Sequence, residues 1–169
     1  MRELLTQKEF DFIGDKDRAF ILAFDSAMGE LGYSCGGTIG NGYCWGRYMT
    51  IYTKVGVKSK KSYARVYIRD DDIVLRLYFS DVEKHADVIG QAPDYIKEAF
   101  TGPFASCDHC RPDCNHRKSY HIARKLYEVC DGKAFWFLEP DIERLPRYLE
   151  LFTEFHPPRK KQKETDHAK

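Results

Sequence analysis

The chain has 169 residues, of which 43% are hydrophobic and 31% are charged, and its formal net charge is +1. This length suits a single domain with one core, and the composition excludes wholesale disorder. A net charge so close to zero excludes a strong general attraction to nucleic acid or to acidic membranes.

The chain begins with helical patterns. Residues 6–9 have the spacing of a capping box, which predicts that a short helix begins there. Apolar residues at helical spacing then predict a longer helix over residues 15–31, which Gly32 would end. Residues 35–42 hold four glycines between a helix and a strand. Phosphate-binding loops have the reverse order, so we expect a flexible turn.

Strands follow the glycine-rich turn. Alternating apolar and polar side chains predict them at about 43–53, 62–69 and 72–79. Residues 81–100 are helical in pattern again, and we expect Gly90 and Pro93 to divide them into two pieces.

The last elements are a hairpin and a helix. Residues 119–129 and 133–138 flank Asp131-Gly132, a strong signal for a hairpin turn. Asp141 would then cap a final helix to about Phe155.

This order predicts one α+β domain over residues 1–155. We expect a mainly antiparallel sheet, made of a three-strand meander plus the hairpin, with helices packed on one face. Residues 156–169 carry five basic and two acidic side chains, which predicts a basic, disordered tail. The sequence has no apolar run of the roughly 18 to 20 residues that cross a bilayer, and its start lacks a signal peptide's apolar stretch. We therefore expect a cytoplasmic protein with no membrane partner.

Most of the six cysteines gather in one loop, residues 104–130. Without a secretory signal, such cysteines indicate metal ligands or thiols rather than disulfides. Four thiolates make a closed tetrahedral site for a structural zinc ion. The ligands that we predict are Cys107, Cys110, Cys114 and Cys130, with His109 and His116 as alternative fourth ligands.

Two other interpretations of the cysteine loop stay open. The thiols need no metal in a reducing compartment, and thiolates also bind iron–sulfur clusters, although the spacing matches no common ferredoxin pattern. Cys35 and Cys44 stand apart from the loop, and each is predicted to be a buried thiol.

The predicted strands also indicate a sheet face rich in tyrosine and arginine, because alternation sends these residues to the side away from the helices. The side chains that we predict to form it are Tyr48, Tyr52, Arg65, Tyr67, Arg76 and Tyr78. Such a face could stack a flat ligand and hold an anion with its guanidinium groups. An ordinary solvated face or a dimer interface would use the same residues.

Several segments of the chain carry a family resemblance. They are residues 107–114, 117–122, 128–132 and 145–149. This pattern resembles small uncharacterised bacterial cytoplasmic proteins with a cysteine-rich loop before a C-terminal hairpin and helix. The order of elements from about residue 43 also resembles the YjbR-like group of small α+β domains, from which the cysteine loop is a departure. Neither resemblance implies a reaction.

The sequence contains none of the common catalytic motifs, such as Gly-x-Ser-x-Gly or His-Glu-x-x-His. We therefore predict a zinc-stabilised, non-enzymatic binding or interaction domain. Its partner would be a small anionic or aromatic molecule, or another protein, at the tyrosine and arginine face. The alternatives are a thiol-based enzyme or redox sensor that uses the cysteines of residues 107–114, and a weak nucleic-acid-binding protein.

Overall fold

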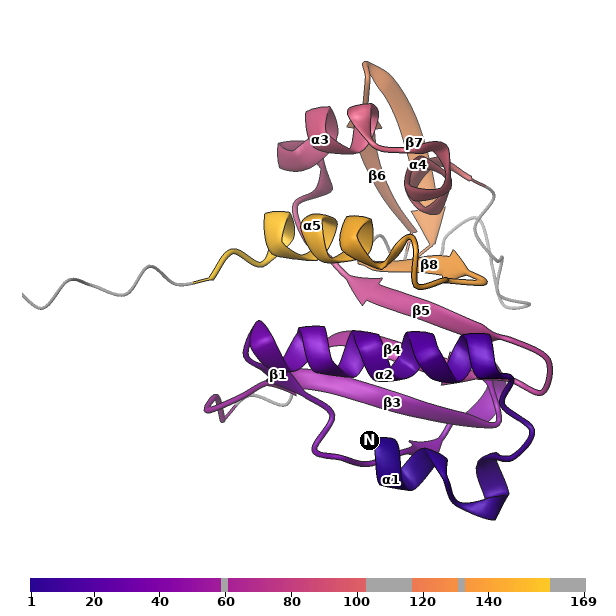
Figure 1. Ribbon diagram of the computed structural model, residues 1–169. Coiled ribbons are helices and arrows are strands. Elements are labelled where there is room, and N and C mark those ends of the chain that lie inside the picture. The colour runs from indigo at the N-terminus through magenta and orange to yellow at the C-terminus, as the bar shows by residue number, and fades with distance from the viewer. Residues whose placement is uncertain (59–60, 103–116, 131–132, 159–169) are drawn as a thin grey trace, which may run out of the picture.

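The protein has an α+β fold built on one antiparallel sheet (Figure 1). The computed structural model describes residues 1–58, 61–102, 117–130 and 133–158. The helices are α1 (Arg2–Leu5), α2 (Asp15–Glu30), α3 (Ala86–Gln91), α4 (Asp94–Thr101) and α5 (Leu145–Phe155), and the 3-10 helices are η1 (Lys8–Phe10), η2 (Tyr43–Trp45) and η3 (Val82–His85). The strands are β1 (Tyr33–Ser34), β2 (Gly40–Asn41), β3 (Tyr48–Lys54), β4 (Ser62–Ile68), β5 (Ile73–Tyr78), β6 (Arg117–Ile122), β7 (Lys125–Cys130) and β8 (Ala134–Leu138).

The main sheet has the strand order β1-β3-β4-β5-β8, and β2 also pairs with β3. Every pairing in it is antiparallel. The predicted meander of three strands is confirmed as β3, β4 and β5. The predicted alternation of side chains along β4 is confirmed. Ala64, Val66 and Ile68 point to one face of the sheet, where they are almost completely buried.

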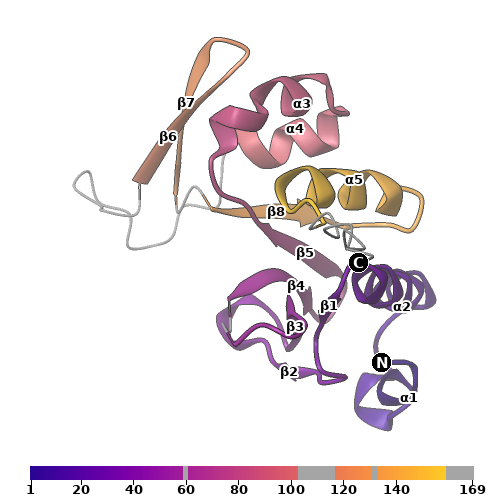
Figure 2. The same ribbon diagram turned by 90° about the vertical axis from the view of Figure 1, so that its left-hand side faces the viewer.

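Helices α2 and α5 cover one face of this sheet (Figures 1 and 2). Helix α2 spans nearly the residues predicted for it, and it buries Phe20, Ile21, Phe24 and Met28 against the strands. Full burial of each such side chain contributes about 1.5–3 kcal/mol. Among the described residues, no helix has the length and apolar character needed to span a bilayer.

Two predictions for the N-terminal part are wrong in their details. A short 3-10 helix, η1, does begin at the predicted place, but α1 precedes it and the predicted capping box does not form. The Thr6 hydroxyl instead donates back to the Glu3 carbonyl at 2.7 Å. The first long strand begins at Tyr48, because η2 occupies the start of the predicted segment. The glycine-rich stretch contributes the two residues of β2.

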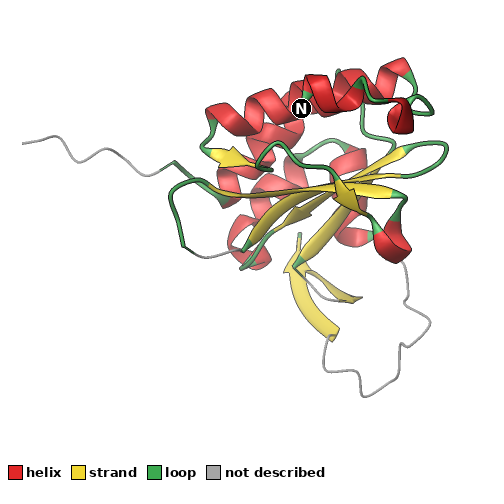
Figure 3. Ribbon diagram, turned by 90° about the horizontal axis from the view of Figure 1, so that it is seen from below, coloured by secondary structure: helices red, strands yellow, loops and turns green. Residues whose placement is uncertain are grey.

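The predicted C-terminal hairpin is also wrong. Residues 119–129 do not form one strand, because the chain turns at Ala123 and Arg124, which both have left-handed φ angles. Strands β6 and β7 pair with each other across this turn, and they stand apart from the main sheet in Figure 3. Strand β8 pairs with β5 instead, because Phe135 and Phe137 are apolar enough to complete the core beside that strand. Residues 131–132 lie outside the described residues.

The remaining helices agree with the sequence pattern. The helical stretch after β5 divides into η3 with α3 and then α4, and the break lies at Pro93 as predicted. Gly90 does not break the chain, because it lies within α3. Helix α5 ends at Phe155 as predicted, but it begins at Leu145. Asp141 caps the preceding turn, where its Oδ1 accepts the Arg144 backbone N–H at 2.9 Å. The predicted tail beyond residue 158 lies outside the described residues.

Candidate functional site

Two of the predicted face residues, Tyr48 and Tyr52, lie on the helix side of the sheet, so this part of the prediction is wrong. Tyr52 is 0% exposed, its ring lies 5.2 Å from that of Phe24, and its hydroxyl donates to Asp25 at 3.2 Å. Tyr48 packs in the same way against Phe10, at 5.0 Å between ring centroids. Both sets of alternate residues in β3 include apolar side chains, so alternation alone does not show which set faces the helices.

The other four predicted residues lie together on the opposite face. In the register of the sheet, Arg65 on β4 stands directly opposite Arg76 on β5. Tyr67 and Tyr78 follow on the same side of these strands, two residues along. We call this surface the Trp/Arg face, and its residues are Trp45, Arg65, Tyr67, Arg76, Tyr78 and Trp136.

The two tryptophans of this face were not predicted. Trp136 reaches it because β8 pairs with β5 and brings Trp136 opposite Arg76. Trp45 comes from η2, and its ring centroid lies 4.8 Å from that of Trp136. No local signal could have found Trp136, because its neighbours come from strands far away along the chain.

The turn that carries Trp45 depends on two glycines. A Cβ atom at Gly42 would lie 2.3 Å from the Gly46 carbonyl oxygen, and one at Gly46 would lie 2.9 Å from the Ile68 carbonyl oxygen. The backbone N–H of Arg47 donates to the same Ile68 oxygen at 2.8 Å, which ties the end of the turn to β4. The close approach of these backbones holds Trp45 over the sheet.

Beneath the tryptophans, the face is packed rather than freely solvated. Tyr67 is 0% exposed, and its ring stacks on Trp136 at 5.6 Å. The Arg76 guanidinium carbon lies 4.4 Å from the centre of the Trp136 ring and 5.2 Å from that of Tyr78. Stacking of this kind fixes the guanidinium plane against the rings.

Positive charge is concentrated on this face. The Tyr67 hydroxyl oxygen lies 3.2 Å from Nη1 of Arg65 and 3.5 Å from Nη1 of Arg76. Within the part of the chain that the structure describes, Arg65 has no ion pair with a carboxylate, and its buried Nε has no hydrogen-bond acceptor. Burial raises the pKa of Tyr78, although Arg76 and Arg65 act in the opposite direction. Two like charges directly opposite each other on neighbouring strands are unfavourable by themselves.

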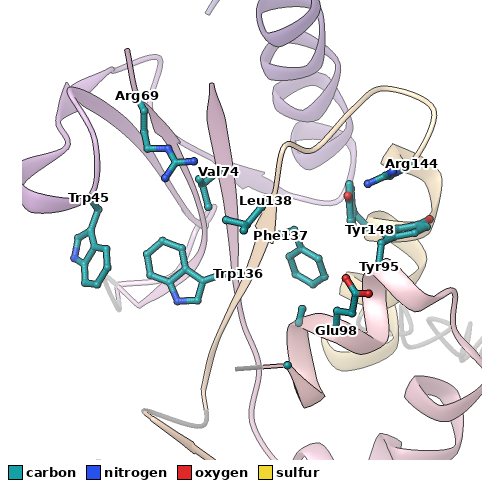
Figure 4. Close-up of a pocket in the computed structure, with 12 residues that line it drawn as sticks. Trp45, Arg69, Val74, Tyr95, Glu98, Trp136, Phe137, Leu138, Arg144 and Tyr148 are labelled. Atoms are coloured by element: carbon teal, nitrogen blue, oxygen red, sulfur yellow. The ribbon is translucent and has the colours of Figure 1, made fainter. Parts of the chain in front are cut away.

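A groove of about 600 Å³ adjoins the Trp/Arg face and passes around the edge of β8 (Figure 4). We call it the edge groove. Apolar and aromatic side chains form most of its wall, and Arg69, Glu98 and Arg144 supply its charges. Its lining residues are Trp45, Arg69, Val74, Tyr95, Glu98, Ala99, Gly102, Trp136, Phe137, Leu138, Arg144 and Tyr148. This volume and this mixture of groups are typical of sites for small ligands.

Most of the predicted zinc ligands lie outside the residues that the structure describes. These are Cys107, Cys110, Cys114, His109 and His116. The backbone of Cys130 ends β7, where it stands opposite Arg117 at the start of β6. In the described ranges, no three His, Cys, Asp or Glu side chains form a group that could hold a metal ion.

The two separate cysteines differ from each other. Cys35 is buried, as predicted, and its sulfur lies 3.4 Å from Oδ1 of Asp25. Burial and the nearby Asp25 carboxylate raise the pKa of this thiol, so Cys35 lacks the lowered pKa of a reactive cysteine. Cys44 is exposed, and the prediction that it is buried is wrong.

No protein-family model matches the chain, and no curated protein or solved structure is detectably similar to it.

Proposed function

We propose that the protein is a binding domain for a small planar anion, which it holds on the Trp/Arg face. The observation that carries this proposal is the pair of opposed guanidiniums, Arg65 and Arg76, beside the two tryptophan rings. An anion between the guanidiniums would turn their mutual repulsion into attraction for the ligand. Nucleoside monophosphates and aromatic carboxylates share the required chemistry.

Aromatic rings supply the second half of the recognition. Trp45 is 41% exposed, so a flat ligand can still stack on its ring. Such stacking contributes about 1–3 kcal/mol per ring, and a hydrogen bond to a charged group contributes about 1.5–3 kcal/mol. A ligand with both features should therefore bind clearly better than a ligand with only one of them.

Tryptophan fluorescence tests this proposal, because both tryptophans of the chain lie on the proposed site. The full chain would be titrated with a panel of nucleoside monophosphates and aromatic carboxylates, with adenosine as the neutral ring and inorganic phosphate as the anion alone. We expect saturable changes with the planar anions and weak or no changes with the two controls. Equal binding of adenosine, or no response to any planar anion, would contradict the proposal.

Substitutions identify the groups responsible. Arg65→Gln removes one guanidinium, and we expect it to weaken binding of the best planar anion at least about tenfold. Arg147→Gln is the matched control, because Arg147 is an exposed arginine on α5 that pairs with Glu150 at 2.7 Å. The control should bind like the wild type.

We also propose that a structural zinc ion joins Cys130 to the cysteines of residues 107–114. In support of this, Cys130 ends β7 directly opposite Arg117. Arg117 is the first described residue after residues 107–114, so the backbone that follows those cysteines lies beside Cys130. A closed set of four thiolates suits zinc and leaves no position for substrate. The zinc would therefore stabilise the hairpin without taking part in any reaction.

Elemental analysis tests the zinc proposal. We expect one zinc ion per chain in the purified protein, and its loss in Cys130→Ser together with lower thermal stability. Cys44→Ser is the control, since Cys44 is exposed and lies in η2. Metal-free wild-type protein, or full zinc content in Cys130→Ser, would be evidence against this set of ligands.

A further inference from the structure

The edge groove has a floor of buried, mainly apolar side chains. Ala99 is 7% exposed, Phe137 is 2% exposed and Tyr148 is 1% exposed, and all three line the groove. Tyr95 stands beside them, with its ring centroid 5.9 Å from that of Tyr148. A cavity of about 600 Å³ with such a floor suits the aromatic or aliphatic part of a small molecule.

The two arginines of the groove are already neutralised by carboxylates of the fold. Arg69 donates from Nε and Nη2 to both carboxylate oxygens of Asp72. This contact raises the pKa of Arg69, and the nearby Glu139 acts in the same direction against the effect of burial. Nε of Arg144 lies 3.2 Å from Oδ2 of Asp141. Neither guanidinium therefore offers an unpaired positive charge to a ligand.

Glu98 is different from these arginines, because its charge is not balanced. Within the residues that the structure describes, its exposed carboxylate forms no ion pair. Glu98 follows Tyr95 by three residues on α4, so the two side chains share one face of the helix. Figure 4 shows that this face borders the groove. The groove therefore has an excess of negative charge on its α4 wall.

The C-terminal end of α4 adds to this negative charge. Ala99 and Gly102 line the groove together with Glu98, so the last turn of the helix forms this part of the wall. The C-terminal end of a helix carries about half an elementary negative charge and favours cations. The last turn of α4 contains no basic side chain that would balance it. A carboxylate and a helix terminus thus both favour a cation at the same place.

We infer that the edge groove binds a small amine that carries an aromatic or alkyl group. The ammonium would lie at Glu98 and the end of α4, and the apolar part would pack on Ala99 and Phe137. Because Glu98 is exposed, the ammonium would keep part of its hydration, which limits the cost of desolvation. This site goes beyond the proposed binding of a planar anion, since its ligand has the opposite charge and contacts neither Arg65 nor Arg76.

Titrations with matched sets of compounds test this inference. Each set contains a primary amine, the alcohol with the same carbon chain, and a carboxylate of similar length. Phenethylamine, phenethyl alcohol and hydrocinnamate form an aromatic set, and hexylamine, hexanol and heptanoate form an alkyl set. The full chain would be titrated at neutral pH and followed by NMR. We expect the amines to bind at least about tenfold more tightly than the alcohols, with shifts in the amide signals of Ala99 and Gly102.

A substitution at Glu98 identifies the group that holds the ammonium. Glu98→Gln keeps the size of the side chain and removes its charge, so we expect it to weaken binding of the best amine at least about tenfold. Glu30→Gln is the matched control, because Glu30 is an exposed glutamate at the end of another helix, α2, and does not line the groove. The control should bind the amine like the wild type. Thermal unfolding would show that both variants are folded.

A second pair of variants places a competing cation in the groove. Leu138 lies on the β8 wall and is 63% exposed, so a polar side chain at this position should not disturb the core. We expect Leu138→Lys to bind the amine more weakly than Leu138→Gln, because the lysine ammonium repels the ligand and competes for Glu98.

Three outcomes would overturn the inference. They are the absence of binding by both amines, alcohols that bind as tightly as the amines, and wild-type affinity for the amine in Glu98→Gln. Arg65→Gln should leave amine binding unchanged, and Glu98→Gln should leave binding of the planar anion unchanged. Failure of this site can therefore be distinguished from failure of the planar-anion proposal.

Discussion

The two faces of the main sheet both carry buried tyrosines, but the tyrosines have different partners. On the helix face, the Tyr52 hydroxyl donates to Asp25 of α2, so the contact joins two layers of the fold. On the Trp/Arg face, the Tyr67 hydroxyl lies beside Arg65 and Arg76 of the same sheet. The helix face thus uses its polar groups to hold the fold together. The other face places two guanidiniums beside one tyrosine hydroxyl within the sheet itself.

The largest difference between the faces should appear when an aromatic ring is removed. Phe24 is completely buried in the main core, so Phe24→Ala should lower the free energy of unfolding by about 3–5 kcal/mol. Trp45→Ala should cost less than half of that, because the Trp45 ring is already 41% exposed. Urea denaturation of both variants measures the difference. Equal losses would mean that the Trp/Arg face is a second core.

Removal of a charge should distinguish the faces less strongly. Asp25→Ala leaves the Tyr52 hydroxyl and the Cys35 thiol without their acceptor, and we expect a loss of about 1–3 kcal/mol in the free energy of unfolding. Arg65→Gln relieves the repulsion with Arg76, so its stability should stay within about 0.5 kcal/mol of the wild type. The same denaturation experiment applies. A loss in Arg65→Gln as large as that in Asp25→Ala would show that Arg65 has a structural role.

The smallest expected effect concerns pH. Burial lowers the pKa of His156, whose Nε2 lies 2.8 Å from the Tyr78 carbonyl oxygen. The unfolded chain then binds the proton more readily than the folded chain does. The contribution of His156 is therefore fully present above its unfolded pKa and is lost as the pH falls below that value. We expect the stability of His156→Gln, measured by thermal unfolding, to fall less than that of the wild type between neutral and mildly acidic pH. Parallel curves for the two proteins would contradict this assignment.

The sequence predicts the local elements of this fold better than their partners. Helix α2 and the meander follow from periodicity, because their apolar residues recur at one clear spacing. The turn at Ala123-Arg124 lacks the usual turn residues, and Asp131-Gly132 offered a stronger but misleading signal. The local turn signal therefore indicates the wrong partner for β8, which pairs with β5. Pairing of β8 with β5 depends on contacts between distant residues, which no local pattern encodes.

The same distinction applies to the candidate site. Arg65, Tyr67, Arg76 and Tyr78 could be placed on one face because the residues between them are consistently apolar. Tyr48 and Tyr52 could not, since their strand is apolar on both sides. Trp136 depends on the unpredicted pairing of β8. The zinc ligands, the tail and the family resemblance stay predictions.

The turn at Gly42 and Gly46 has a consequence for how the Trp/Arg face can change. These glycines lack side chains, yet a single methyl group at position 42 would collide with a carbonyl oxygen and push η2 away from β3. Gly42→Ala would thus move Trp45 away from the proposed ligand site, although no residue that contacts the ligand would be substituted. A comparison of sequences at the aromatic and basic positions alone would wrongly predict that such a protein binds the ligand.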